Sequence, residues 1–187
     1  MRIIAGKHKG RKIELGKEAA DIVRPTSDFA REAIFNILIH GKFGQGESFI
    51  GKDVLDVFCG TGAFGLEAIS RGAKRVLFID QSRDALTNAR YNAMKMNETE
   101  AADFMLADAT KLGRAKQSYP LIFLDPPYFG KMLEPALKSL HTSGWVDKDS
   151  LIIIEHDAKE QVAIPEFFTI LDERRYGRAV IKLLKLA

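Results

Sequence analysis

Two short stretches of the sequence combine residue types and spacings that could support chemistry. The first, residues 54–69, places Asp56 near the end of an apolar run and follows it with Gly60, Gly62 and Gly65. A glycine loop between a strand and a helix lets a ligand approach the backbone, because glycine has no Cβ and accepts positive φ, while the last glycine lets the helix pack closely on the sheet. We therefore expect a nucleotide-like cofactor here, facing the N–H groups of the loop.

The glycine spacing fits two cofactors, and Asp56 favours one of them. A dinucleotide would place its pyrophosphate at the helix N-terminus, where the Asp56 carboxylate would repel it. S-adenosylmethionine instead brings an ammonium group, which the same carboxylate would attract. This difference of sign is worth about a few kcal/mol at an effective dielectric of about 20. The alternative is that Asp56 only caps a turn.

Two further acids follow apolar runs at positions suited to the same cofactor. Asp80 ends the run 76–80, at roughly the spacing from Asp56 at which a nucleotide-binding unit delivers a carboxylate to ribose hydroxyls. A helix cap is the alternative for Asp80. Asp108 follows a third run, 104–106, where it could accept a hydrogen bond from an adenine amino group. The predicted cofactor contacts are Asp56, Phe58, Gly60, Thr61, Gly62, Asp80, Gln81, Asp108 and Ala109.

The second stretch is Asp125-Pro126-Pro127-Tyr128, which follows the apolar run 121–124. An exocyclic amino group on a nucleobase is a poor nucleophile, because its lone pair is delocalised into the ring. Asp125 and the carbonyl of Pro126 could accept its two N–H bonds, and the two prolines would keep the turn rigid. Tyr128 could stack on the base, a contact of about 1–3 kcal/mol. The four residues predict methyl transfer from a sulfonium held about 3 Å from the nitrogen, with Asp125 taking the proton late; a simple proline turn is the alternative.

The surrounding pattern predicts the elements that would position these residues. Apolar runs that alternate with helical periodicity indicate a parallel sheet covered by helices, and two final runs indicate an antiparallel pair. We expect an α/β, Rossmann-like, doubly wound seven-stranded sheet, mostly parallel, with an antiparallel hairpin at the edge and a small N-terminal β-hairpin and helix extension. The expected strands are 54–57, 76–80, 104–106, 121–124, 151–154, 167–171 and 179–184, with helices after the glycine loop, at 82–96 and at 131–140.

Both ends of the sequence are basic. Residues 1–13 contain five cations and no acid, which predicts a hairpin whose tip contacts phosphates, although a solvated hairpin is the alternative. His8 in this tip is expected to be a surface residue. A helix that follows would turn Phe29, Ala33, Ile34, Ile37 and Leu38 to one face and end near Gly41. The predicted RNA-binding residues are Arg2, Lys7, Lys9, Arg11, Lys12 and Arg24, and a second basic run holds Arg174, Arg175, Arg178, Lys182 and Lys185.

Length and composition narrow the classes of protein. A chain of 187 residues with a net charge of +3 fits one domain, 1–187, which we divide into a basic hairpin (1–23), a helix and loop (24–50) and a cofactor-binding core (51–187). No apolar run has the length of a membrane helix or signal peptide, so a cytoplasmic protein is expected. The single cysteine, Cys59, excludes an internal disulfide and a multi-cysteine zinc site, and no metal is expected. We interpret Cys59 as a small packing residue rather than a nucleophile.

Taken together, residues 54–155 resemble the class I S-adenosylmethionine-dependent methyltransferases that modify amino groups, whose hallmark is a glycine-rich loop followed by [DNS]PP[YFW]. The sequence is similar over nearly its whole length to the RsmD family, bacterial 16S rRNA guanine-N2 methyltransferases. That similarity rests on residues 2–6, 24–26, 31–36, 65–73 and 123–128. It implies S-adenosylmethionine as cofactor and a guanine 2-amino group of small-subunit rRNA, free or in a 30S particle, as substrate. Two departures are Asp80, where glutamate is common, and Arg178-Ala179, where small polar residues are expected.

Three alternatives stay open. The grip on an amino group does not choose the base, so an adenine-N6 or cytosine-N4 methyltransferase acting on DNA or RNA also fits. A non-catalytic RNA-binding ribosome assembly factor could keep the same fold, although Asp56, Asp80 and Asp125 are all present. A nicotinamide oxidoreductase could use the same glycine spacing. The sequence does not fix the oligomeric state, for which a monomer is the expectation.

Overall fold

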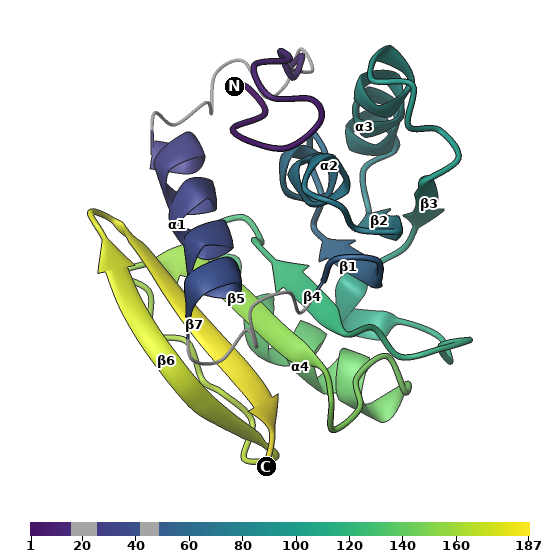
Figure 1. Cartoon of the computed structure of the whole chain (residues 1–187). Coiled ribbons are helices and arrows are strands. Elements are labelled where there is room, and N and C mark those ends of the chain that lie inside the picture. Colours follow the sequence, from purple (N-terminus) through teal and green to yellow (C-terminus); the bar gives the residue numbers. More distant parts are fainter. Residues whose placement is uncertain (16–25, 42–48) are drawn as a thin grey trace.

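A seven-stranded sheet forms the centre of the computed structural model, which describes residues 1–15, 26–41 and 49–187 (Figure 1). The strand order is β3-β2-β1-β4-β5-β7-β6. The first five strands in sequence run parallel, and β7 is antiparallel to both β5 and β6. The predicted fold class is confirmed. The strands are β1 Asp53–Val57, β2 Arg75–Asp80, β3 Ala102–Leu106, β4 Leu121–Leu124, β5 Leu151–Asp157, β6 Phe168–Tyr176 and β7 Ala179–Leu186.

Helices cover both faces of this sheet, because side chains alternate between the faces and the central strands β4 and β5 are buried along their whole length. In β1, Val54 packs into one apolar cluster with the helices α1, α2 and α3, while Leu55 packs into a second cluster with α4 on the other face. Figure 1 shows the first three helices on one side of the sheet and α4 on the opposite side. The helices are α1 Thr26–His40, α2 Ala63–Ser70, α3 Arg83–Lys95 and α4 Leu133–Thr142, with a short 3₁₀ turn, η1, at Ala109–Lys111.

The predicted N-terminal hairpin is present, though its pairing is short. Arg2 and Lys12 form a single antiparallel bridge, and the Ile3 N–H donates to the Arg11 carbonyl at 2.9 Å. Ile3 and Ile13 are buried against the helices on that face of the sheet. The hairpin is therefore anchored by its apolar side chains and also at its tip, where Ser70 accepts from the Lys7 N–H at 2.8 Å and from the His8 N–H at 3.0 Å.

Two local expectations are wrong. Phe29 was expected on the inward face of α1 but is 60% exposed, and its ring lies edge-on to Tyr176 at 5.8 Å between centroids. Arg31 is buried on that helix instead, because it reaches polar partners described below. The final hairpin is also longer than expected: β6 continues to Tyr176, so the turn that joins it to β7 consists of residues 177–178 alone.

No helix in residues 26–41 or 49–187 is long and apolar enough to cross a membrane.

Candidate functional site

The glycine loop and the Asp-Pro-Pro-Tyr turn leave the sheet side by side. Strands β1 and β4 are neighbours, and Val57 pairs with Leu124, so the next residues, Phe58 and Asp125, emerge at the same edge. The chain passes from β1 to β2 and β3 on one side and then returns to β4 on the other side. Open α/β sheets bind ligands at such a reversal, outside the carboxyl ends of the strands. The two stretches with predicted chemistry therefore share one edge.

Glycine is required at two points of the loop for different reasons. Gly60 has a φ of 52°, and no atom lies within 4 Å of the place where its Cβ would stand, so its backbone is open to approach. A Cβ on Gly65 would lie 2.3 Å from the Phe78 ring, so this glycine allows α2 to pack closely on β2, as predicted. Phe58 takes a φ of 61° although it is not glycine, which marks a constrained backbone at the start of the loop.

The backbone N–H groups of the loop do not face outward as expected. The Gly60 N–H donates to Asp80 at 2.9 Å, and the Gly65 N–H donates to Asp56 at 2.9 Å. The Gly62 N–H donates to the Cys59 carbonyl at 2.8 Å. Because these three donors are used within the protein, this part of the loop lacks the nest of free N–H groups that a pyrophosphate needs.

Asp56 lies beneath the loop rather than on its surface. The side chain is 1% exposed, and its contact with Gly65 fixes the first turn of α2. Burial raises the pKa of Asp56 to about 8, against the opposing effect of the Gly65 hydrogen bond, and the charge of Asp80 adds to the rise. This geometry matches the turn-capping alternative, and contact with a ligand's ammonium group stays a prediction. Burial likewise raises the pKa of the Cys59 thiol, as suits a packing residue.

Asp80 and Asp108 both bind neighbouring backbone while part of each carboxylate stays accessible. Asp80 accepts from the Gly60 N–H and, through its other oxygen, from the Ser82 N–H, each at 2.9 Å. Asp108 caps η1 by accepting from the hydroxyl of Thr110 at 2.7 Å and from its N–H at 2.9 Å, and these contacts lower the pKa of Asp108. A carboxylate has about four acceptor positions, so both acids keep capacity for a ligand.

The other predicted cofactor contacts are placed near these acids. Gln81 is exposed directly after Asp80, whereas Ala109 is buried after Asp108. The Thr61 carbonyl accepts from the amide of Asn92 at 3.1 Å, and its hydroxyl contacts the Met1 sulfur at 3.9 Å. Asn92 on α3 thereby holds the loop from below.

The Asp-Pro-Pro-Tyr turn presents its acid outward. Asp125 is exposed, Pro126 is buried, Pro127 is exposed and Tyr128 is half-buried. The carboxylate of Asp125 is thus not turned into the core, where it could not meet a substrate.

Sequence reasoning missed a second acid at this turn, Glu155. It follows Ile154, which pairs with Leu124, so Glu155 occupies the position on β5 next to Asp125. Glu155 is buried, and the hydroxyl of Tyr128 donates to it at 3.4 Å, a long hydrogen bond. A polar residue after three consecutive isoleucines, 152–154, is the sequence signal that could have indicated it.

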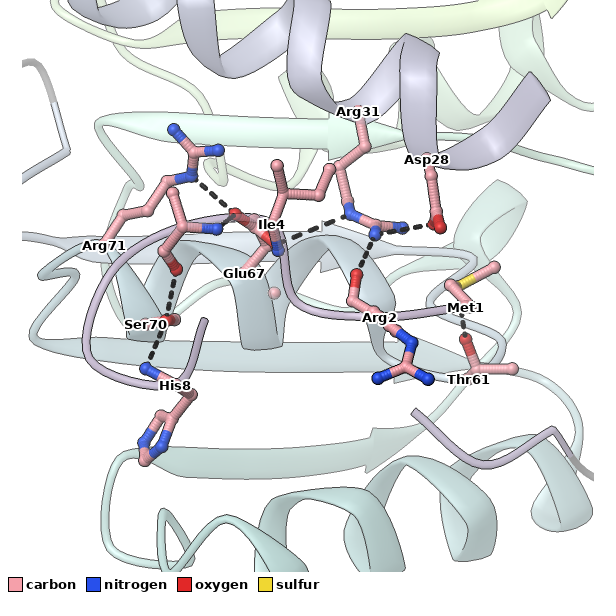
Figure 2. Close-up of polar contacts among 12 residues, drawn as sticks. Met1, Arg2, Ile4, His8, Asp28, Arg31, Thr61, Glu67, Ser70 and Arg71 are labelled. Carbon is pink, nitrogen blue, oxygen red and sulfur yellow. Dashed lines mark hydrogen bonds and ion pairs between the residues drawn. The ribbon is translucent and has the colours of Figure 1, made fainter. Parts of the chain in front are cut away.

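A buried polar cluster, also missed, pins the N-terminal hairpin to α2 (Figure 2). Glu67 is fully buried and accepts from the Ile4 N–H at 2.7 Å, the Ala5 N–H at 3.0 Å and the guanidinium of Arg71 at 2.6 Å. Arg31 lies 3.8 Å from the same carboxylate and donates to the Arg2 carbonyl at 2.6 Å. The basic hairpin is therefore fixed to α2, the helix that follows the glycine loop.

The cations of the hairpin are less isolated than expected. Lys7 lies 2.8 Å from Glu98, which follows α3, and Lys12 lies 3.1 Å from Glu14. His8 also contacts Glu98 and is only partly exposed. The compensating acid Glu98 is remote in sequence, which is why the sequence does not indicate it. Of the predicted RNA-binding residues, Arg2, Lys7, Lys9, Arg11 and Lys12 are exposed, and Arg24 lies outside the described residues.

Comparisons with known proteins agree with the resemblance noted in the motifs of this chain. A Bacillus subtilis protein named "Putative rRNA methyltransferase YlbH" is 32% identical over 170 residues, which are 89% of this chain and 86% of that protein. "Ribosomal RNA small subunit methyltransferase D" of Haemophilus influenzae is 29% identical over 182 residues, covering 95% and 89%. The solved structure "Putative methyltransferase yhhF from Escherichia coli" has a TM-score of 0.81 at 27% identity, covering 100% and 97%. The family model described as "Conserved hypothetical protein 95" matches residues 1–185, and the chain belongs to this family, the RsmD family.

Proposed function

We propose that this protein is an S-adenosylmethionine-dependent methyltransferase that modifies the N2 amino group of a guanine in small-subunit rRNA. The observation that carries the proposal is the pairing of Val57 with Leu124, which brings the glycine loop and the Asp-Pro-Pro-Tyr turn to one edge. Cofactor and acceptor can then lie within reach of each other, which direct transfer requires. The names of the relatives support rRNA of the small subunit as the substrate class.

The loop suits a cofactor that carries positive charge. Three of its N–H donors are used internally, and Asp80 lies against it with part of its carboxylate accessible, so a pyrophosphate would meet an acid and few donors. An ammonium or sulfonium group would instead be attracted. Asp80 would hold the ribose hydroxyls, Asp108 the adenine amino group, and the open backbone at Gly60 would border the amino-acid portion. When bound, S-adenosylmethionine supplies an electrophilic methyl group.

The residues of the turn prepare the acceptor. Asp125 and the carbonyl of Pro126 accept the two N–H bonds of the base amino group, so that its lone pair points away from the ring. Tyr128, steadied by Glu155, stacks on the base. After attack the nitrogen is cationic and strongly acidic, so Asp125 accepts a proton without needing a raised pKa of its own.

The test is transfer of a labelled methyl group to four acceptors: naked 16S rRNA, assembled 30S particles, other RNA and double-stranded DNA. We expect label in rRNA, at one guanine whose product is N2-methylguanine. Label in adenine or cytosine would replace the proposed base with the amino-methyltransferase alternative. Calorimetry with S-adenosylhomocysteine and with NADH separates the cofactors, and tight binding of NADH alone would overturn the proposal. Binding of rRNA without cofactor or turnover would indicate the assembly factor.

The remaining expectations belong to the same proposal. We propose a monomer that works without a metal, and the acceptors above decide between free rRNA and the 30S particle. Among the residues that the structure describes, no group of three or more His, Cys, Asp and Glu side chains is placed to hold a metal ion. Activity that survives a chelator and sedimentation as one species would agree with this part.

A further inference from the structure

A hollow of about 470 Å³ lies between α1 and the edge strand β6, away from the glycine loop. Its walls include Phe29 and Asn36 from α1, and Arg174 and Tyr176 from β6. We call this hollow the α1–β6 groove. Figure 1 shows α1 running beside the β6–β7 hairpin, so the groove joins segments far apart in the sequence.

The groove contains an aromatic pair that core packing does not explain. Phe29 is 60% exposed although α1 has an apolar face on which it could have been buried. It lies edge-on to Tyr176, with ring centroids 5.8 Å apart and an interplanar angle of 74°. Exposed aromatic rings that keep a face available are the platforms on which unpaired bases stack.

The charges around this pair are of both signs, and the arginines among them are held in place. Arg174 is held by Asp172 at 2.8 Å, and Arg175 donates to the Gly177 carbonyl at 3.0 Å. Arg178 in the adjoining turn is 72% exposed while it binds Asp157. The acids near them are Glu32 in the groove, Asp172 and Glu173 on β6, and Asp157 on β5. A fixed guanidinium beside an aromatic ring suits a phosphate next to a stacked base.

One end of the groove, at Phe29 and Tyr176, lies near the edge that carries the proposed chemistry. Because β7 is antiparallel to β5 and Ala179 pairs with Asp157, the β6–β7 turn lies at the carboxyl end of β5. Asp125 leaves β4 at the same edge, three strand spacings from β6, which is about 14 Å. An RNA strand whose target base lies at Asp125 can therefore reach Phe29 with a nearby nucleotide.

We propose that the α1–β6 groove binds an unpaired nucleotide of the RNA substrate beside the target base, with its base stacked on Phe29 and its phosphate at Arg174. This inference rests on the proposed function, because it takes the bound RNA to be the strand that is methylated. It also gives a role to the basic C-terminal hairpin, which the cofactor and the Asp-Pro-Pro-Tyr turn do not use.

The test measures binding of a fluorescein-labelled 12-nucleotide oligouridine by anisotropy, without any methyl donor. Phe29→Ala should weaken binding about 5- to 150-fold, the equivalent of one lost stack, whereas Phe29→Tyr should restore it. Tyr91→Ala is the matched control, because Tyr91 is also a partly exposed aromatic with a cation nearby, Lys95, but lies on α3. Circular dichroism melting of each variant separates loss of binding from loss of fold.

Two further arms separate stacking from general electrostatics. A duplex RNA of the same length should bind Phe29→Ala as well as wild type, since its bases are already stacked. Arg174→Gln should reduce the salt dependence of oligouridine binding by about 0.7 in log–log slope, as for one phosphate contact on a single strand. Equal losses of oligouridine affinity for Phe29→Ala and Tyr91→Ala, or an unchanged affinity for Phe29→Ala, would overturn the proposal that the groove binds a nucleotide.

These outcomes are distinct from those of the proposed function. If wild type methylates rRNA and Phe29→Ala binds oligouridine normally, the groove inference is wrong and the proposed activity stands. If Phe29→Ala loses oligouridine binding and no acceptor is methylated by wild type, the groove stands and the activity is wrong.

Discussion

The loop after β1 and the turn after β4 begin at paired positions of the same sheet, yet their acids differ in exposure. In the loop, Asp56 is buried and Asp80 binds backbone N–H groups, so the acids hold the protein's own chain. In the turn, Asp125 is exposed. The difference indicates that the two segments have different roles. The rigid loop would bind the small cofactor, and the exposed acid of the turn would contact the RNA. Substitutions in the loop should therefore change stability, and substitutions in the turn should change activity.

The largest effect is expected for Asp125→Ala. Loss of one amino-group acceptor and proton acceptor should lower kcat by about 10²- to 10⁴-fold, or roughly 3–5 kcal/mol in the barrier. Affinity for S-adenosylhomocysteine, measured by calorimetry, should stay within about twofold, since Asp125 is proposed to contact the base and not the cofactor. Asp149→Ala, an exposed acid before β5, is the control. Equal loss of cofactor affinity and turnover would contradict the separate roles assigned to the loop and the turn.

The next effect is a pH dependence that belongs to the loop. Asp56 has an ordinary pKa of 3.8 that burial raises to about 8, so between these values the folded chain holds a proton that the unfolded chain has released. Its contribution to stability is complete below about pH 4 and is lost as the pH rises through 8. Asp56→Asn keeps an acceptor for the Gly65 N–H, has no such proton, and should gain on wild type by up to about 1.4 kcal/mol per pH unit.

Urea unfolding of wild type and Asp56→Asn at pH 5, 6 and 7 checks this sign. A constant difference in the free energy of unfolding across the three pH values would mean that Asp56 titrates normally.

A smaller loss of stability is expected for Gly65→Ala. The new Cβ would meet the Phe78 ring at 2.3 Å and a methyl of Val76 at 2.8 Å, which forces α2 away from β2. We expect about 1–3 kcal/mol of destabilisation by overpacking, in spite of the better helix propensity of alanine. Gly113→Ala, where no atom lies within 4 Å of the new Cβ, should change stability little. Matching melting temperatures for the two variants would show that α2 is not closely packed on β2.

The smallest effect tests whether the exposed cations of the basic hairpin contact RNA, as Asp125 in the turn is proposed to do. Lys9 and Arg11 are exposed at its tip, whereas Lys7 and Lys12 already contact acids. Replacing Lys9 and Arg11 with Gln should lower the salt dependence of rRNA binding by about 1.4–1.8 in log–log slope and leave stability unchanged. The double replacement of Lys116 and Lys148, exposed before β4 and β5, is the control. The same slope for both double variants would leave the hairpin without phosphate contacts.

Features set by local sequence could be predicted, while features set by distant partners could not. Apolar runs and glycine spacing were enough for the sheet, the loop and the turn, because burial and backbone conformation act within a few residues. The Glu67 cluster could not be predicted, since Glu67 and Ile4 are far apart in sequence and periodicity carries no information on such pairs. The inward use of the loop N–H groups and the exposure of Phe29 depend in the same way on neighbours brought by the fold.

The placement of β1 between β2 and β4 also has a consequence for biosynthesis. Val54 pairs with Val76, which is close in sequence, and with Leu121, which is much later. Closing the longer connection costs more chain entropy and is slower. The early strands can therefore associate while the ribosome is still translating. The glycine loop and the Asp-Pro-Pro-Tyr turn lie side by side only after β4 has paired with β1. We expect a nascent chain to gain catalytic activity in a single step, only after β4 has been synthesised and has paired with β1.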